Sequence, residues 1–544
     1  MRGYRSLLMC FALLTTGCAV GQNSGLLDPA NPNTSADQTE SLADRARRLR
    51  SSKPREAQTT EQDAKTLFRS VEEIFAFASK DTGFPIRQSV KRRLIGRQDV
   101  EKQVRDGMTK ADLAEHFART ELTMKKFGLL PRDFDIREFM VKSSGQEIAG
   151  YYDPKSKTIS LVNWMPLEQL HPVLAHELTH ALQDQNYDLD KWAEAGRAKS
   201  GLQPDSTMDE TVLARHAVAE GQAMIVYVDY MLAPYGRNLR NTPGVLARME
   251  EPAVTAVVDT EFLHKAPMIM REAGTFPYRK GLIFEGELLE KGGTAMAFAG
   301  AFARPPRNTH EVLQPRAYIE REEIPPVRIP NVKGLLGGKY EIYDSGVVGE
   351  LDVEALLKQY GERHIADQLA ANWRGGTYIA CKRAEVAGSA TTGDVALLYV
   401  SRWKSEKAAA RFAELYGAAV ATRYLKPSPQ APVTCSDADC PLWRSEIATE
   451  EGPVIVERWP ENTVIVSESF EASTAAQLRQ AVRKGDASLH AQDASQDELS
   501  SRLYQLPAFR RFQADLGESI LREVERRWLA SGGERDERPS PKAH

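Results

Sequence analysis

The sequence holds one short motif whose residue types and spacing could bind a metal ion: His-Glu-Leu-Thr-His, from His176 to His180. In a helix, residues four positions apart lie on one face about one turn apart, so both imidazoles could ligate a single Zn²⁺. Glu177 would then stand beside the metal as the general base of a hydrolase. The alternative is a chance match, which we expect in roughly one chain in a hundred of this composition.

A catalytic zinc usually has three protein ligands and one open position, so a third ligand must come from another segment. Residues 213–228 predict an apolar helix that carries Glu220, and a buried carboxylate is costly unless it binds a metal or a counter-charge. We therefore expect Glu220 to be the third ligand. His216, one turn earlier, is an alternative ligand or a proton donor, or else an ordinary core histidine. Asp184, one turn after His180, could orient a ligand imidazole, or else be a solvated residue near the helix end.

The elements around the motif can also be predicted. Residues 147–162 carry apolar and β-branched residues around an Asp-Pro-Lys-Ser turn at 153–156, which indicates a β-hairpin with its second strand at 158–162. Pro172 is expected in the first turn of the metal-binding helix, where its missing N–H costs nothing. Upstream, helical periodicity indicates helices from residue 63 to the Gly-Phe-Pro break at 83–85. These are followed by helices at about 99–108 and from 109 to Gly128.

Two segments of the chain resemble a known class of peptidase. His176 to Asp184 (His-Glu-Leu-Thr-His-Ala-Leu-Gln-Asp) resembles the active-site helix of thermolysin, and 219–223 (Ala-Glu-Gly-Gln-Ala) resembles the glutamate-bearing helix of gluzincins. The gap between the two is longer than in thermolysin. The chain is more similar to a group of exported bacterial and archaeal HExxH proteins in which a Gly-Tyr-Tyr-Asp-Pro hairpin precedes the motif. The resemblance covers about residues 65–325. It implies a zincin-like fold, a Zn²⁺ cofactor, a polypeptide substrate, and pairing of strand 158–162 with the substrate backbone.

Later pieces of the same resemblance are less complete. The Tyr-x-x-Gly-x-x-Phe segment of the group matches residues 278–284, and the Gly-Gly and Pro-Pro turns that follow it are also present. The next segment of the group reads Ser-Thr-Glu-Gln with a His before the final Pro, and this chain departs from it at His310, Glu311 and Gln314. Tyr152 and His310 are candidates for stabilising the oxyanion, and the departure counts against His310.

The N-terminal residues predict export. Residues 1–18 combine a basic start with a short apolar run, and they end in Thr-Thr-Gly-Cys18, which resembles the lipobox of bacterial lipoproteins with Thr15 where Leu is usual. Lipidated Cys18 would anchor the chain in the membrane; the alternative is an ordinary secretory signal. Ala19 favours, by resemblance, the outer membrane facing the periplasm. The polar residues 19–62 predict a flexible linker.

After a proline-rich segment at 324–330 the composition changes, which indicates a domain boundary. We expect an α+β accessory domain over 335–484 and a helical, charged tail over 485–544. The accessory domain carries the pair Cys435 and Cys440, which could form a disulfide in an oxidising compartment. Its expected elements are helices at 353–361 and 405–415, strands at 377–383 and 395–403, and a hairpin of 454–458 with 463–468.

The composition excludes little else. Hydrophobic residues make up 42% and charged residues 27%, and the net charge of −4 gives no indication of a nucleic-acid surface. The expected fold is α+β: a mainly helical, zincin-like metallopeptidase domain over 63–330 with a small β-sheet, the accessory domain, and the tail. The expected function is a zinc-dependent endopeptidase of the bacterial cell envelope. The alternative is a catalytically silent zinc-binding lipoprotein that acts as a chaperone or scaffold, and the sequence names no partner for the accessory domain.

Overall fold

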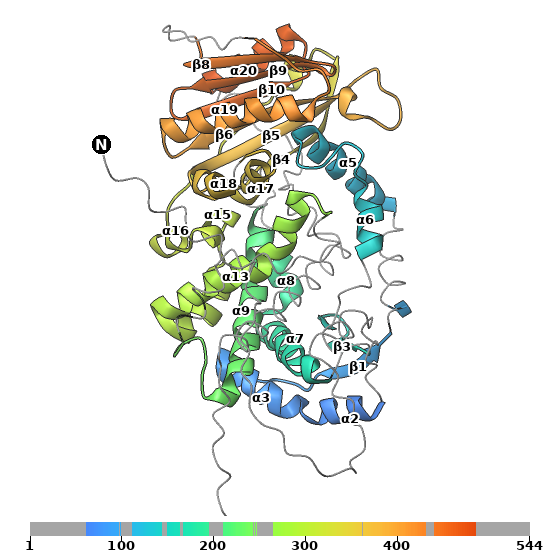
Figure 1. Ribbon diagram of the computed structural model, residues 1–544, viewed down its shortest axis with the longest axis vertical. Coiled ribbons are helices and arrows are strands. Elements are labelled where there is room, and N and C mark those ends of the chain that lie inside the picture. Colours follow the sequence, from blue (N-terminus) through green and yellow to red (C-terminus); the bar gives the residue numbers. More distant parts are fainter. Residues whose placement is uncertain are drawn as a thin grey trace, which may run out of the picture. The chain divides into compact units, whose positions relative to one another are not determined.

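A computed structural model of the chain has an α+β fold, with helices throughout and a large antiparallel sheet in the C-terminal region (Figure 1). The export signal with Cys18, the linker, nearly all of the helix expected at 99–108, and the tail beyond 485 lie outside the described residues. The described residues are 61–96, 98–99, 111–143, 150–163, 167–194, 210–242, 244, 246, 265–361, 363–430 and 440–485.

We call the described residues up to 330 the helical part and those from 331 onward the sheet part. The helices are α2 (Glu61–Arg69), α3 (Val71–Thr82), α5 (Ala111–Phe127), α6 (Ile136–Ser143), α7 (Leu167–Tyr187), α8 (Leu189–Glu194), α9 (Glu210–Leu232), α13 (Met268–Ala295), α14 (Ala301–Ala303), α15 (Thr309–Leu313), α16 (Pro315–Glu320), α17 (Glu350–Tyr360), α18 (Arg363–Ala370), α19 (Glu406–Arg423) and α20 (Ala472–Lys484), with a π-helical turn η2 (Met296–Gly300) and 3₁₀ turns η1 (Ala233–Tyr235), η3 (Lys333–Leu336) and η4 (Thr392–Asp394). The strands are β1 (Lys91–Ile95), β2 (Gly150–Asp153), β3 (Thr158–Val162), β4 (Tyr340–Val347), β5 (Trp373–Arg383), β6 (Val395–Trp403), β7 (Ser428–Pro429), β8 (Trp443–Thr449), β9 (Gly452–Trp459) and β10 (Thr463–Glu468).

The small sheet has the order β1-β3-β2, with β3 parallel to β1 and antiparallel to β2. The predicted hairpin is therefore confirmed, and all five residues of β3 are buried. The expectation that β3 itself pairs with a substrate backbone is wrong, because β3 has a neighbour on each side. The second neighbour is β1, whose Lys-Arg-Arg start gives no strand signal in the sequence. Among the described strands, β1 and β2 form the two edges of this sheet.

The helices α7, α9 and α13 form the centre of the helical part (Figure 1). The backbones of α9 and α13 touch: a Cβ on Gly221 would lie 2.3 Å from the carbonyl oxygen of Gly281, and a Cβ on Gly281 would lie 2.3 Å from that of Ala217. Neither glycine can carry a side chain without separating the helices. The close contact fixes the stretch of α9 that carries Glu220.

The position of Pro172 differs from the expectation. Helix α7 begins at Leu167, so Pro172 lies in its second turn and not its first. A proline there removes one backbone hydrogen bond of the helix. Burial offsets this loss, because the flanking Leu170, Val173 and Leu174 are all at most 4% exposed.

The large sheet has the order β4-β5-β6-β10-β9-β8-β7, and every neighbouring pair is antiparallel. Helix α19 covers one face of it (Figure 1). Along β6 the side chains alternate between the two faces: Leu397 and Tyr399 join the main core, whereas Leu398 and Val400 join a second core that contains residues of α20. Both faces of the sheet are therefore buried.

The elements expected at 353–361, 377–383, 395–403 and in the C-terminal hairpin are confirmed to within a few residues. Helix α19, expected to end at Leu415, continues to Arg423, and Ala419 and Val420 in this extension are buried. Cys440 is disulfide-bonded. Its expected partner, Cys435, lies outside the described residues, so that pairing stays a prediction.

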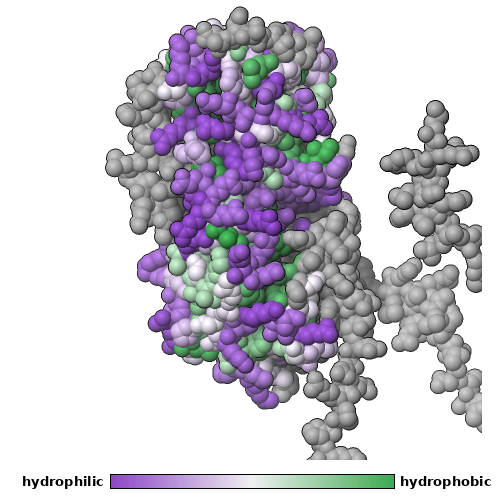
Figure 2. All heavy atoms as spheres, turned by 90° about the vertical axis from the view of Figure 1, so that its left-hand side faces the viewer, coloured by the Kyte–Doolittle hydropathy of each residue, from purple (hydrophilic) through white to green (hydrophobic). Residues whose placement is uncertain are grey.

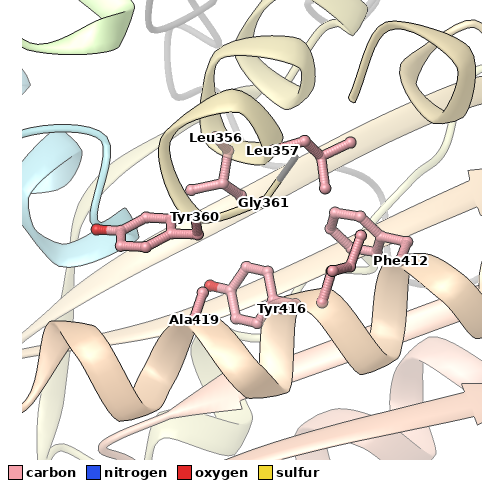
Figure 3. Close-up of a pocket in the computed structure, with 8 residues that line it drawn as sticks. Leu356, Leu357, Tyr360, Gly361, Phe412, Tyr416 and Ala419 are labelled. Carbon is pink, nitrogen blue, oxygen red and sulfur yellow. The ribbon is translucent and has the colours of Figure 1, made fainter. Parts of the chain in front are cut away.

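Figure 3 shows a small apolar pocket on the sheet part, between the end of α17 and the middle of α19. Leu356 and Tyr360 approach it from one side, and Phe412 and Tyr416 from the other. The hydroxyl of Tyr416 donates to the buried carboxylate of Glu468 at 2.7 Å, so it holds the helix on the sheet. The pocket is a packing feature of the interface between the two helices.

Hydrophilic residues predominate over the upper part of the face drawn in Figure 2, and a paler patch lies lower down. Three large hydrophobic side chains are notably exposed among the described residues: Ile86, Leu425 and Leu442. No helix in the described part of the chain has the length and apolar character that crossing a bilayer requires.

Helix α5 packs on the large sheet, although it precedes the hairpin in the sequence and was expected to belong to residues 63–330. Phe127 makes edge contacts with Tyr378 and Tyr399, at centroid distances of 5.1 and 5.6 Å. Beside it Lys126 is fully buried, and its ammonium group donates to the Glu451 carboxylate at 2.8 Å and to the Ser469 hydroxyl at 2.7 Å. The packing of the sheet part therefore includes a segment from the N-terminal half of the chain.

Replacing Lys126 with Met should lower the free energy of unfolding by about 1.5–3 kcal/mol, because the buried Glu451 carboxylate would lose one charged hydrogen-bond partner and keep only Arg132 as its ion-pair partner. Urea denaturation of the purified protein measures the change. The matched control is Lys125→Met on the same helix, whose ammonium group pairs with Glu121 at a partly exposed site. That control should cost less than about 1 kcal/mol. Equal costs for the two variants would contradict the assignment of Lys126 to a buried ion pair.

A buried pair of carboxyl groups links α3 to α9. Asp81 and Asp229 both contact one guanidinium N–H group of Arg240, at 2.7 and 2.9 Å, and the second oxygen of Asp81 has no hydrogen-bond partner in the described structure. Burial, and then the charge of Asp81, raise the pKa of Asp229 to about 7, and burial also raises the pKa of Asp81. The pair therefore keeps a proton that the unfolded chain, with an ordinary carboxyl pKa of 3.8, has already lost.

The stabilisation from this proton is complete below about pH 4 and is lost as the pH rises through about 7. Asp229→Asn stays neutral at every pH. We expect its free energy of unfolding, relative to wild type, to rise by on the order of 1–3 kcal/mol between pH 5 and pH 8. Urea denaturation at both pH values tests this, with the exposed Asp190→Asn as control. A difference that does not change with pH would refute the shared proton.

Candidate metal centre

Helix α7 places His176, Glu177 and His180 at the centre of the helical part, where it packs against α9. The Nε2 atoms of the two imidazoles lie 3.0 Å apart. Glu220, on α9, brings its Oε2 atom to 3.2 Å from Nε2 of His176 and 3.3 Å from Nε2 of His180. The three predicted ligands therefore meet, and they form the one group among the described residues with metal-ligand geometry.

The distances between these three donor atoms fit a zinc ion. Zinc binds histidine nitrogen and carboxylate oxygen at about 2.0–2.2 Å, so neighbouring ligand atoms of a tetrahedral site are about 3.3 Å apart. The observed edges of 3.0, 3.2 and 3.3 Å are close to this value. The side chains of His176, His180 and Glu220 are between 10% and 13% exposed, so water screens their charges little.

The carboxylate of Glu220 gives the group a negative charge. Burial alone would lower the pKa of His180, but the carboxylate beside it raises that pKa to about 9. Burial alone would raise the pKa of Glu220, but His180 and the other two imidazoles hold it well below its usual range. A field that attracts a proton to Nε2 of His180 also attracts a cation. The donor set thus suits Zn²⁺ in both geometry and charge.

His216 lies one turn before Glu220 on α9, and its Nε2 atom contacts Oε1 of Glu220 at 2.9 Å. Its position is neither that of a third imidazole ligand nor that of an ordinary core histidine. It binds the carboxylate oxygen that faces away from the two ligand histidines, so it orients Glu220.

The match to a known family lies in the C-terminal part of the chain, outside the metal centre. Residues 339–482 match the family described as Domain of unknown function (DUF8575). That span runs from β4 into α20 and lies within the accessory domain expected at 335–484. Searches of curated proteins and of solved structures gave no match.

Glu177 is 5% exposed and lies next to the ligand group. Burial and the nearby charge of Glu220 raise the pKa of Glu177 above its ordinary value, although the two neighbouring imidazoles and the backbone N–H of Tyr152 in β2 oppose this shift. Its Oε2 atom is buried and has no hydrogen-bond partner in the described structure. A buried carboxylate oxygen without a partner is costly, and one beside a metal site is placed to receive a proton from water.

Tyr152 and Asp184 hold the hairpin on the metal helix. The hydroxyl of Tyr152 donates to Asp184 at 2.7 Å, and Nζ of Lys157, from the hairpin turn, donates to the same oxygen at 2.6 Å. The expected contact of Asp184 with a ligand imidazole is not made, because the carboxylate of Asp184 accepts hydrogen bonds from Tyr152, Lys157 and the backbone N–H of Leu189 instead. The Tyr152 hydroxyl is likewise engaged with Asp184, so its candidate role at an oxyanion is not supported by this geometry.

The residue that contacts a ligand imidazole is Gln183. Its Oε1 atom lies 2.9 Å from Nδ1 of His180. Gln183 was not predicted as a site residue, although it stands three positions after His180, a spacing that puts two residues on the same helix face. Tyr278 of α13 was not predicted as one either, and its buried ring stacks on the His176 imidazole with the ring centroids 6.3 Å apart. The aromatic type and the position in the Tyr-x-x-Gly segment were the available signals.

His310 does not belong to the ligand group. It is 1% exposed on α15, and its Nδ1 atom forms a short hydrogen bond with Glu350, the first residue of α17. Gln314 donates to the other oxygen of that carboxylate at 2.9 Å. These contacts join the helical part to the sheet part. His310, Gln314 and Glu350 therefore form a polar junction between α15 and α17.

Proposed function

We propose that the protein is a zinc-dependent endopeptidase with a zincin-like catalytic domain of the gluzincin type, exported to the bacterial cell envelope. The observation that carries the proposal is the triangle of His176 Nε2, His180 Nε2 and Glu220 Oε2, with edges of 3.0, 3.2 and 3.3 Å, beside the buried carboxylate of Glu177. A zinc ion held by these ligands would polarise the scissile carbonyl and lower the pKa of the attacking water.

The protein's own residues supply the proton transfers. Glu177 accepts the proton of the attacking water and delivers it to the leaving amine, which requires a carboxylate within reach of both. The Tyr152 N–H holds one oxygen of Glu177, and the other is free for water. Glu177 and Glu220 are both largely buried, so their charges act in surroundings of low dielectric, where electrostatic interactions are strong.

An extended polypeptide is the substrate class that the neighbouring sheet supports. β2 is one of the two edge strands of the small sheet among the described strands, and Tyr152 within it contacts Glu177 through its backbone. An exposed sheet edge binds an extended chain by adding it as a further strand. The scissile bond of such a chain would lie beside Glu177, which is the reason for proposing peptide hydrolysis.

The proposal is tested by loading the purified protein with one equivalent of Zn²⁺ and incubating it with a mixture of unstructured polypeptides. Mass spectrometry should detect internal cleavage that stops when zinc is removed by a chelator and returns when zinc is restored. Zinc binding without any cleavage would favour the alternative, a silent zinc-binding envelope protein.

The lipid anchor proposed on Cys18 is tested separately, by mass spectrometry of the N-terminal peptide from protein expressed in a bacterial envelope.

A further inference from the structure

Gln183 is completely buried, and its amide can adopt one orientation only. Its Nε2 atom lies 2.9 Å from the backbone carbonyl oxygen of Ala219 and 3.2 Å from Oε1 of Gln222. A carbonyl oxygen only accepts hydrogen bonds, so the amino group of Gln183 must face Ala219. Its Oε1 atom therefore faces Nδ1 of His180, which must donate. A neutral His180 then has its hydrogen on Nδ1 and its lone pair on Nε2, the atom in the ligand triangle.

The orientation of Gln222 is fixed in the same way, from the opposite side. Gln222 is also completely buried, and its Nε2 atom donates to the carbonyl oxygens of Ala297 and Phe298 at 2.9 and 3.1 Å. Both carbonyls belong to the π-helical turn η2, and such turns occur often at functional sites. Because its amino group is committed to η2, Gln222 must present Oε1 to Gln183. The carbonyls of η2 thus fix the orientation of the Gln222 amide, Gln222 fixes that of the Gln183 amide, and Gln183 fixes which ring nitrogen of His180 donates.

We infer that Gln183 and Gln222 are positioning residues of the metal centre, which fix the Nδ1–H tautomer and the ring orientation of His180 from the backbone of η2. This inference rests on the metal site of the proposed function but not on peptidase activity. Gln222 is the informative member, because none of its hydrogen bonds reaches a ligand atom. Hydrogen bonds to the second nitrogen of a ligand histidine set its tautomer and strengthen its binding to the metal.

The experiment measures the Kd for Zn²⁺ by competition with a chromophoric chelator. Gln183→Leu keeps the volume of the side chain and loses the acceptor, so the Kd should rise about 10–100-fold. Gln222→Leu should raise it several-fold in the same direction. The double variant should bind no more weakly than Gln183→Leu alone, because both act through one chain of hydrogen bonds.

Gln183→Glu separates positioning from a purely structural role. A carboxylate still accepts from Nδ1 of His180 but cannot donate to Ala219, so zinc affinity should be retained while the free energy of unfolding falls. The visible spectrum of the Co²⁺-loaded protein should likewise change in Gln183→Leu and resemble wild type in Gln183→Glu. The matched control is Gln185→Leu on the same helix. Gln185 bonds the backbone of Arg87, and its loss should leave the Kd unchanged.

Two outcomes would overturn the inference: an unchanged zinc Kd in Gln183→Leu, or a loss in Gln183→Glu as large as in Gln183→Leu. A wild-type protein that binds zinc but cleaves no polypeptide would refute the proposed peptidase, and the Kd values would still decide the roles of the two glutamines. A wild-type protein that binds no zinc would overturn both.

Discussion

Replacing Glu177 with Gln should lower kcat/KM for polypeptide hydrolysis by about 10²–10⁴-fold while the zinc content stays near one equivalent. The substitution keeps the shape of the side chain and an oxygen that can accept from the Tyr152 N–H. It removes the carboxylate that takes up and returns the proton. Cleavage rates on a quenched fluorescent peptide, together with metal analysis of the same samples, measure the two quantities side by side.

The matched control is Glu73→Gln, an exposed glutamate on α3, which should retain both activity and zinc. Hydrolysis at the wild-type rate in Glu177→Gln would remove Glu177 from the reaction and leave the proposed mechanism without a base. A loss of zinc in that variant would instead show that the carboxylate contributes to metal binding.

Replacing His180 with Ala should reduce the zinc content from near one equivalent to a small fraction of that value, because two donor atoms hold zinc far more weakly than three. The free energy of unfolding should show the same loss of zinc binding. Zinc at about 100 times its Kd should raise the free energy of unfolding of the wild type by about 2.7 kcal/mol. The variant should show no such gain, and a chelator should lower the Tm of the wild type alone.

His171→Ala is the matched control for this prediction, since His171 lies on the same helix α7 but is not in the ligand group. It should bind one equivalent of zinc and keep the zinc-dependent gain in Tm. A full equivalent of zinc in His180→Ala would place the metal elsewhere. No zinc in any variant or in the wild type would reduce the His-Glu-Leu-Thr-His motif to a chance match.

Residues in regular helices were the easiest to predict. His176 and His180 are ligand candidates because their types and their spacing of four residues act within one helix, where local geometry decides which face a side chain occupies. Glu220 was identifiable because a carboxylate on an apolar helix needs a partner, and the structure gives it three imidazoles. The hairpin before α7 followed from its turn residues in the same local way.

The contacts that cross between distant elements were harder to predict. Asp184 and Gln183 are neighbours on α7, and both were close enough to His180 to be candidates. Which of them contacts the imidazole depends on the hairpin, because Tyr152 and Lys157 of the hairpin donate hydrogen bonds to the carboxylate of Asp184. In the same way His310 was a candidate for stabilising the oxyanion against which the motif already counted, and the structure places its imidazole on the buried Glu350 of another helix.

The sequence by itself determined which residues carry donor atoms and which of them share a helix face, because side-chain chemistry and helical periodicity are local properties. The tertiary structure alone decided that β1 takes the second edge of β3, that α5 packs on the large sheet, and that Gln222 orients Gln183 from the π-helical turn. Each of these depends on burial and hydrogen-bond partners that are brought together over long sequence distances. A buried amide or ammonium group must find its partner wherever the packing places one, and no local pattern encodes that place.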